Sequence, residues 1–317
     1  MTNTNILDNE FKTQVYKVEN LEDHITNFIK NQYKTTTKNT YKYGLTKFNN
    51  YLVNATDVKE LRQDNITNIV RDYRGYLTDN TDLKSGSIDS YITQVKSFLN
   101  QYLNLKPKKI RKLDYTKKEP KYIELEEVQG LINTVQYITG NKEQITRDKA
   151  IICTLFTGGL RISELLNIKL EDYYTRDGTS YLMIIGKGRA LDSPEKIVIP
   201  PQTVSLINDY LKQRRDHNRT CKYLFCSLND KPLTRQSINK EIKKIANEYD
   251  KRNNTNIAPR VSTHTFRHSL ARYCLVTQGL PINQVKDILR HSNIETTAKY
   301  LTTTQEEITE IRKGLIF

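Results

Sequence analysis

Residues 261–300 read VSTHTFRHSLARYCLVTQGLPINQVKDILRHSNIETTAKY and carry three of the five histidines in a chain of 317 residues. His264 and Arg267 are three positions apart, so a helix here places both side chains on one face. His291 stands at the end of a second predicted helix, and Tyr300 follows nine residues later. Arginine and histidine beside a tyrosine indicate a site that binds a phosphate group and moves a proton.

Two further basic residues occur at the ends of predicted elements upstream. Arg161 follows the Gly-Gly turn of TGGLRISEL (157–165), and Lys187 lies between glycines in GKGRA (186–190), where the backbone can approach a ligand closely. Arginine forks bind non-bridging phosphate oxygens, a lysine or histidine can protonate the leaving oxygen, and a tyrosine hydroxyl can act as nucleophile. Because no Asp/Glu cluster typical of two-metal nucleases is evident, we expect phosphodiester cleavage without a metal or other cofactor.

TGGLRISEL, GKG after a strand, HTFRH and LRHSNIETTAKYL occur in an order that resembles the tyrosine recombinases, which include phage integrases and Xer-type recombinases. The resemblance spans about residues 122–305. It implies a site-specific recombinase that cleaves and rejoins double-stranded DNA through a 3′-phosphotyrosyl intermediate, for integration, excision or dimer resolution. It assigns roles to seven residues: the phosphate-clamping Arg161 and Arg267, the general acid Lys187, the general acid/base His264, the phosphate hydrogen-bond donor His291, the nucleophile Tyr300 and the supporting Glu164.

The chain departs from the family pattern in two places. Arg290 stands where the family usually has glycine before the histidine, and either a phosphate contact or a solvated charge would account for it, as for Arg272. The turn after Lys187 is longer than usual, which leaves Lys196 as a weaker alternative for the general acid. His268 falls off the face shared by His264 and Arg267, and we interpret it as structural.

The pattern of the chain divides it into four parts. Residues 1–20 form an N-terminal tail, and residues 21–105 show four apolar stripes at helical spacing, which predict a helical domain. The resemblance makes this the core-binding (SAM-like) DNA-binding domain. Residues 106–121 are a basic, proline-bounded linker. We expect this linker to lie along DNA phosphates, and a solvated tether is the alternative; its predicted DNA-binding residues are Lys108, Lys109, Arg111 and Lys112.

Residues 122–317 are the predicted catalytic domain. Two β-rich runs at 180–185 and 196–199 predict a hairpin, and helices are expected at 203–215, 234–250, 264–278, 281–290 and 294–302. The fold class is therefore mainly α with a small β-hairpin or sheet (α+β). After Tyr300, Ile308, Ile311 and Leu315 recur at helical spacing. The resemblance implies that this C-terminal tail helix docks on a neighbouring protomer; docking on its own domain is the alternative.

Composition points to the class of partner. The formal charge is +14, which favours a polyanion, namely nucleic acid or an anionic membrane surface. No apolar run is long enough to cross a bilayer, and the N-terminus has no signal-peptide pattern, so we expect a cytoplasmic protein. Since the resemblance makes double-stranded DNA the partner, we expect no membrane partner and no small-molecule substrate. The cysteines are interpreted as free buried thiols.

The resemblance further implies a homo-tetramer on two synapsed duplexes. A catalytically inactive DNA-binding regulator with the same fold is the alternative from another class. A DNA-relaxing topoisomerase of related chemistry is disfavoured by the separate helical N-terminal domain.

Overall fold

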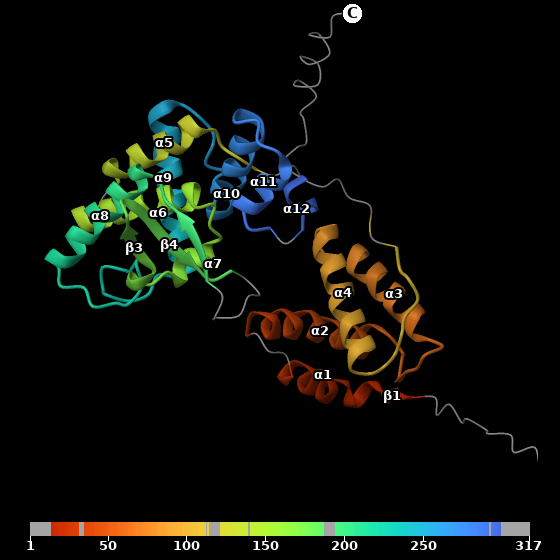
Figure 1. Ribbon diagram of the computed structural model, residues 1–317. Helices are drawn as coiled ribbons and strands as arrows, with labels where there is room; N and C mark the ends of the chain where they lie inside the picture. Colours follow the sequence, from red (N-terminus) through yellow and green to blue (C-terminus); the bar gives the residue numbers. More distant parts are fainter. Residues whose placement is uncertain are drawn as a thin grey trace, which may run out of the picture. The chain divides into compact units, whose positions relative to one another are not determined.

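The structure is a computed structural model that describes residues 14–31, 35–111, 113, 121–138, 140–186, 194–291 and 293–298. The chain divides into two compact units, Met1–Lys117 and Lys118–Phe317 (Figure 1). Each unit has a hydrophobic core of its own. None of the described helices is long and apolar enough to cross a membrane.

Unit 1 consists of the four helices that the apolar stripes predict. They are α1 (Leu21–Lys30), α2 (Thr35–Ala55), α3 (Ile66–Asp79) and α4 (Ser85–Gln101). Two short strands, β1 (Tyr16–Lys17) and β2 (Glu60–Leu61), pair antiparallel beside them. Two residues are too few to show an alternating pattern, so the sequence did not indicate these strands.

Aromatic side chains from different helices close the core of unit 1. Phe48 and Tyr73 are fully buried with ring centroids 5.0 Å apart, and Phe28 contacts Phe98 at 5.4 Å. Burying a side chain of this size contributes about 2 kcal/mol. Because each pair joins two helices, the packing fixes the bundle.

The first half of the basic linker is held against unit 1. The Lys106 backbone N–H donates to Gln63 Oε1 (2.8 Å), and Gln63 Nε2 donates to the Lys106 carbonyl (2.9 Å). The Lys108 N–H donates to Thr67 Oγ1 (3.0 Å), and Ile110 packs against the core. Residues 106–110 of the linker are therefore held against unit 1 beside the start of α3.

Unit 2 contains eight α-helices and one sheet among its described residues. The helices are α5 (Leu125–Thr134), α6 (Lys142–Thr157), α7 (Ile162–Asn167), α8 (Pro201–Asp216), α9 (Arg235–Asn253), α10 (Thr263–Arg272), α11 (Ile282–Ile288) and α12 (Glu295–Ala298). A π-helical segment, Tyr273–Thr277, continues α10. Helix α6 has ten buried residues, and it packs against α5, α8 and α10.

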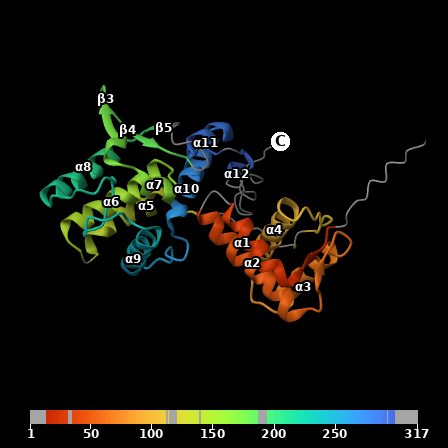
Figure 2. The ribbon, with the colours of Figure 1, turned by 90° about the horizontal axis from the view of Figure 1, so that it is seen from below.

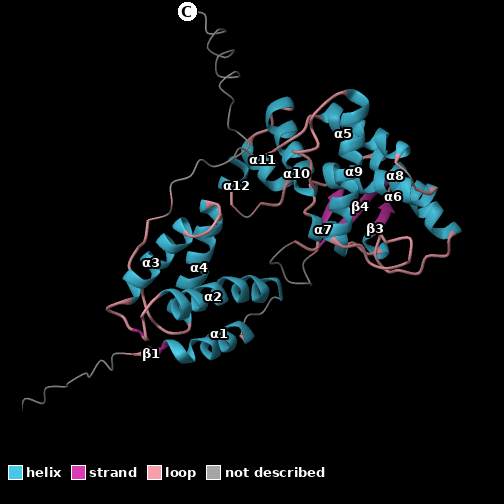
Figure 3. Ribbon diagram, turned by 180° about the vertical axis from the view of Figure 1, so that it is seen from behind, coloured by secondary structure: helices cyan, strands magenta, loops and turns pink. Residues whose placement is uncertain are grey.

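The sheet has three antiparallel strands in the order β3-β4-β5: β3 (Tyr173–Arg176), β4 (Thr179–Ile184) and β5 (Glu195–Val198) (Figure 2). The predicted hairpin is β4–β5. Strand β3 was not predicted from the sequence. Asp177 and Gly178 join it to β4, and both have positive φ angles (50° and 74°). That conformation matches the tight hairpin turn that Asp-Gly favours. The chain is mainly helical with small sheets, which confirms the predicted fold class (Figure 3).

All four cysteines are free. Cys153, Cys226 and Cys274 are buried, and Cys221 is half-buried. The expectation of free thiols is confirmed, and the expectation of burial holds for three of the four.

Candidate active site

A tight turn at the end of α6 positions Arg161. Helix α6 ends at Thr157 and is capped by Gly158. Gly159 adopts a left-handed conformation (φ 53°) in which an added Cβ would lie 2.9 Å from Leu270 Cδ2. Glycine adopts this conformation without strain and leaves room for the Leu270 side chain. The turn leaves Arg161 as the residue that precedes α7, with its side chain partly exposed.

Glu164, in the first turn of α7, holds Arg161 at two points. Its Oε2 accepts from the Arg161 backbone N–H (2.9 Å), and its Oε1 accepts from Arg161 Nη1 (2.7 Å). Glu164 is only 3% exposed. Burial by itself would raise the pKa of Glu164, but the hydrogen bonds from Arg161 and the charges of Arg290 and Arg161 lower it. The buried carboxylate is therefore ionised and anchors the arginine.

Arg267, on α10, is 1% exposed and joins two other segments of the site. Its Nη1 donates to the carbonyl oxygen of Gly159 (2.5 Å), and its Nη2 donates to the carbonyl oxygen of Leu289. The first carbonyl belongs to the turn before Arg161, and the second lies two residues before His291. One guanidinium thus brings together three segments far apart in the sequence.

His264 lies one turn before Arg267 and is exposed. Partial desolvation, followed by the charges of Arg267, Arg161 and Arg235, lowers the pKa of His264. Its ring contacts the ring of His268 edge-on, with centroids 4.3 Å apart. A neutral imidazole that is exposed beside two arginines is suited to accept or relay a proton.

His291 follows α11 and is 7% exposed. The pKa of His291 is lowered to about 4. Desolvation of the ring is the main cause, and the charges of nearby groups add to it: Arg267, Arg161, Arg290 and His264. The ring is therefore neutral at neutral pH.

The ring orientation of His291 is set by a residue that the sequence interpretation missed. His291 Nδ1 lies 2.8 Å from the hydroxyl of Thr297, a fully buried residue of α12. A threonine six residues after the histidine carries no distinctive signal by itself. Only the fold shows that α12 brings the hydroxyl back against the ring.

Arg290 was expected to be either a phosphate contact or a solvated charge, and its contacts are those of neither. Its side chain is only 4% exposed, so it is not a solvated charge, and it donates to protein acceptors instead of being presented as a phosphate contact. Its φ angle is +56°, in the left-handed region that glycine adopts without strain. A non-glycine residue in this conformation costs roughly 1–2 kcal/mol.

Two of the predicted catalytic residues, Lys187 and Tyr300, lie outside the described residues, as do Lys112 and the predicted tail helix. Of the predicted linker contacts, Lys108, Lys109 and Arg111 are exposed. The structure thus brings five of the seven predicted site residues together: Arg161, Glu164, His264, Arg267 and His291.

The alternative residues weighed from the sequence have structural contacts elsewhere. The Lys196 ammonium lies over the ring of Tyr181, 4.3 Å from its centroid, within the sheet. Arg272 lies over the ring of Tyr122 in the same way, at 4.3 Å. Stacking of this kind stabilises a cation by about 0.5–1 kcal/mol at exposed positions.

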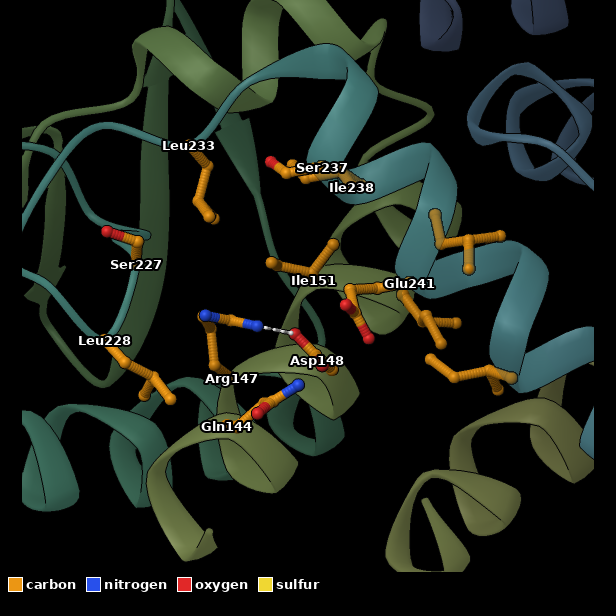
Figure 4. A pocket seen from close by; sticks show the side chains of 13 residues that line it. Gln144, Arg147, Asp148, Ile151, Ser227, Leu228, Leu233, Ser237, Ile238 and Glu241 are labelled. Carbon is orange, nitrogen blue, oxygen red and sulfur yellow. Dashed lines mark hydrogen bonds and ion pairs between the residues drawn. The ribbon is translucent and has the colours of Figure 1, made fainter. Parts of the chain in front are cut away.

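A separate cavity of about 220 Å³ lies between α6, α9 and the loop before α9. Ile151 and Ile238 belong to its apolar wall, and Arg147 and Asp148 form an ion pair of 2.8 Å within it (Figure 4). Burial of Asp148, only partly offset by Arg147, raises its pKa to about 6. None of the five assembled site residues lines this cavity, so it is distinct from the candidate active site.

Within the described ranges, no group of three or more His, Cys, Asp or Glu side chains is placed to hold a metal ion. The positive charges at the candidate site come from Arg161, Arg267 and Arg290. Of these, the guanidinium groups of Arg161 and Arg267 are suited to neutralise a phosphate whose charge increases during cleavage.

Comparison with known proteins identifies the family of the chain. The model of the phage integrase family matches residues 121–307, more than half of the chain. The chain therefore belongs to the phage integrase family, a class of tyrosine recombinases that cleave and rejoin DNA.

Relatives in sequence carry the same class name. The chain is 31% identical over 244 residues to tyrosine recombinase XerD of Staphylococcus saprophyticus subsp. saprophyticus, covering 74% of this chain and 77% of the relative. It is 30% identical over 225 residues to tyrosine recombinase XerA of Pyrococcus furiosus, covering 71% of this chain and 72% of the relative. The match to XerD of Listeria innocua is 29% over 198 residues and covers 62% of that protein.

Solved structures share the fold at lower identity. XerH bound to its difH substrate in a post-cleavage complex superposes with a TM-score of 0.67 at 20% identity, over 88% of this chain and 80% of XerH. The Tn1549 transposon integrase in complex with transposon right-end DNA superposes with a TM-score of 0.69 at 16% identity, over 95% of this chain and 99% of the other.

Proposed function

We propose that this chain recombines DNA at specific sites with Tyr300 as the nucleophile. Tyr300 attacks a phosphodiester, the 3′-phosphate becomes bonded to the tyrosine oxygen, and the 5′-oxygen leaves as a hydroxyl. A 5′-hydroxyl of the partner duplex then attacks the phosphotyrosyl bond and restores Tyr300. The bond energy is kept in the covalent intermediate, so the cycle needs no nucleotide cofactor.

The proposal rests on the arrangement that brings Arg161, Arg267 and His291 together. Arg267 donates to the carbonyl oxygens of Gly159 and Leu289, which lie two residues before Arg161 and His291, and Glu164 holds Arg161. The two guanidinium groups bind the non-bridging oxygens and stabilise the charge of the pentacoordinate phosphorus. His291 is neutral at neutral pH, and a neutral imidazole can donate one hydrogen bond to the phosphate. These groups account for binding and charge stabilisation.

Proton transfer is assigned to two further residues. We assign Lys187 as the general acid that protonates the departing 5′-oxygen, because a lysine between glycines can approach the DNA backbone. His264 is assigned to general acid/base transfer, and its lowered pKa keeps a lone pair available at neutral pH. Glu164 supports the site by fixing Arg161, which binds the phosphate.

We assign unit 1 as the DNA-binding domain and the basic linker as a phosphate contact. Lys108, Lys109 and Arg111 are exposed, while the backbone at Lys106 and Lys108 is hydrogen-bonded to Gln63 and Thr67, so these cations start from an ordered segment. An ordered cation loses less conformational entropy on binding than one on a free tether. Lys112 is assigned to the same set.

The assembly is proposed to be a homo-tetramer on two synapsed duplexes in the cytoplasm. Each of the two duplexes needs two cleavages, one per strand, and each protomer supplies one tyrosine. The C-terminal tail is proposed to dock on the neighbouring protomer, which would couple the position of Tyr300 to assembly.

A covalent-complex experiment tests the proposed function. The chain with Tyr300→Phe is used to select its preferred duplex from random DNA, and that duplex is then prepared with a nick beside the cleavage position. We expect the wild-type chain to form a covalent adduct with it and none with a scrambled duplex. Binding without any adduct would favour the inactive regulator, and equal cleavage of both duplexes would favour a relaxing topoisomerase.

A further inference from the structure

Arg290 adopts a conformation that its residue type disfavours. Its φ angle of +56° lies in the left-handed region, where glycine is tolerated without strain and arginine is not. The side chain is nevertheless buried to 4% exposure. An arginine that is both strained and buried must be retained by the contacts of its guanidinium group.

Apart from a hydrogen bond of Nη1 to the carbonyl oxygen of Ile288 (3.2 Å), two residues earlier, those contacts lie in the segment that carries Arg161. Arg290 Nη1 donates to the carbonyl oxygen of Gly158 (3.1 Å), and Nη2 donates to the carbonyl oxygen of Gly159 (3.1 Å) and to Glu164 Oε2 (3.3 Å). The remaining nitrogen, Nε, is buried with no partner. The two terminal nitrogens therefore make every cross-segment contact of this side chain.

Arg290 shares an acceptor with each of the two proposed phosphate clamps. The carbonyl oxygen of Gly159 accepts from both Arg290 and Arg267, and Glu164 accepts from both Arg290 and Arg161. The turn at residues 289–291, the turn at 158–161 and helix α10 are thus joined in one closed network.

We propose that Arg290 is a positioning residue for DNA cleavage: it holds the turn that carries His291 against the turn that carries Arg161, and it shares the charge of Glu164 with Arg161. The inference rests on the proposed function. Glycine at position 290 would permit the same backbone turn but would make none of these contacts. Lysine would keep the charge but presents a single ammonium, which lacks the planar fork that reaches the three acceptors of the Arg161 segment.

The charge of Arg290 has a second consequence at His291. The charged and titratable groups that face the His291 ring are Arg267 and His264 from α10, Arg161 from the turn before α7, and Arg290 itself. All of them favour the neutral ring. Removing Arg290 therefore raises the pKa of His291. Because desolvation is the largest cause of the lowered pKa, a loosened turn would raise it too. Arg290→Lys separates the two effects, since it keeps the charge and loses the fork.

The test compares Arg290→Gly and Arg290→Lys with the wild-type chain in single-turnover adduct formation on the selected nicked duplex at saturating DNA. We expect both variants to react roughly tenfold to a hundredfold more slowly, the loss typical of a reacting group displaced by about 1 Å. Half-site Kd should stay within about twofold, because Arg290 is not exposed to DNA. Asn254→Gly is the matched control: Asn254 also has a positive φ (52°) but is exposed at the end of α9, so its replacement should leave the rate unchanged.

A second readout needs no DNA. The His291 ring is titrated by nitrogen-detected NMR in the DNA-free chain, and we expect a higher pKa in Arg290→Gly than in Arg290→Lys or wild type. If Arg290→Gly reacts at the wild-type rate and His291 titrates unchanged, the proposal is overturned. A wild-type chain that forms no adduct contradicts the proposed function, and the titration then tests Arg290 by itself. Arg290→Lys covers the case in which the glycine variant does not fold.

Discussion

Arg267 and Arg290 donate hydrogen bonds to the same carbonyl oxygen, that of Gly159. Arg267 lies on α10, and Arg290 lies in the turn after α11. A backbone carbonyl has two lone pairs, so it can accept from both. Gly159 is itself held in a left-handed turn that only glycine fits without strain. The position of Arg161, two residues later, therefore depends on two buried arginines that do not contact it directly.

The first prediction concerns the buried carboxylate. Glu164→Gln removes the charge that faces Arg161 and Arg290, and it leaves Arg290 buried without its anionic partner. We expect a loss of about 3 kcal/mol in the free energy of unfolding, the range found when a buried pair is broken on one side. Urea unfolding measures it.

The matched control for this change is Glu248→Gln. Glu248 pairs with Arg252 at 2.7 Å on the exposed face of α9, where a single pair contributes at most about 1 kcal/mol. Equal losses for Glu164→Gln and Glu248→Gln would contradict the role of Glu164 as a buried anchor.

The second prediction concerns the pH dependence of stability through His291. In the unfolded chain the imidazole takes up a proton near pH 6.5, whereas in the folded chain it does so only near pH 4. Between these values the unfolded state binds more protons, so the folded state gains stability as pH rises from 4 to 6.5 and no further above. The full effect is of the order of 3 kcal/mol.

His291→Asn isolates this contribution from the other titrating groups, including Asp148, whose raised pKa acts in the opposite sense. The difference in unfolding free energy between wild type and His291→Asn should grow with pH from 4 to 6.5 and then stay level. A difference that does not change over this interval means that His291 titrates normally in the folded chain.

The third prediction concerns the linker. Each phosphate contact adds roughly −0.9 to the slope of log affinity against log salt concentration. Replacing Lys108, Lys109, Arg111 and Lys112 with Gln should flatten that slope while the preferred sequence stays the same, because phosphate contacts position a protein without specifying bases. An unchanged slope would make the linker a tether only.

The fourth prediction concerns the tail. A chain truncated after Thr304 should bind a half-site nearly as well as the full chain but should lose cooperative binding to a full site and synapsis. Gel-shift titrations on both duplexes measure this. Equal losses on half-site and full site would instead place the tail on its own domain.

Periodicity was sufficient for the helices of unit 1, because each has one continuous apolar stripe facing a single core. It was insufficient for β3 and for the short β1–β2 pair, where few residues alternate and tertiary pairing decides. The basic linker shows the same limit. Its charge pattern indicated a separate segment, whereas its backbone at Lys106 and Lys108 is held by Gln63 and Thr67, which carry no signal of that role.

At the candidate site, spacing placed Arg161 beside Glu164 and His264 beside Arg267, because each pair lies within one helical turn. The functions assigned to these residues stay predictions. Spacing could not show that Arg290 is buried or that Thr297 contacts His291, since both depend on how α11 and α12 fold back on α10. The unusual arginine at a glycine position was the one available signal for Arg290.

The central claim is cleavage by Tyr300 without a metal, and one measurement tests it most directly. The wild-type chain, Tyr300→Phe and Tyr273→Phe are each incubated with the selected nicked duplex in excess EDTA, and covalent adducts are counted on a denaturing gel. The account predicts adducts with wild type and Tyr273→Phe and none with Tyr300→Phe, although all three bind the duplex. An adduct formed by Tyr300→Phe, or cleavage that is lost in EDTA and restored by magnesium, would contradict it.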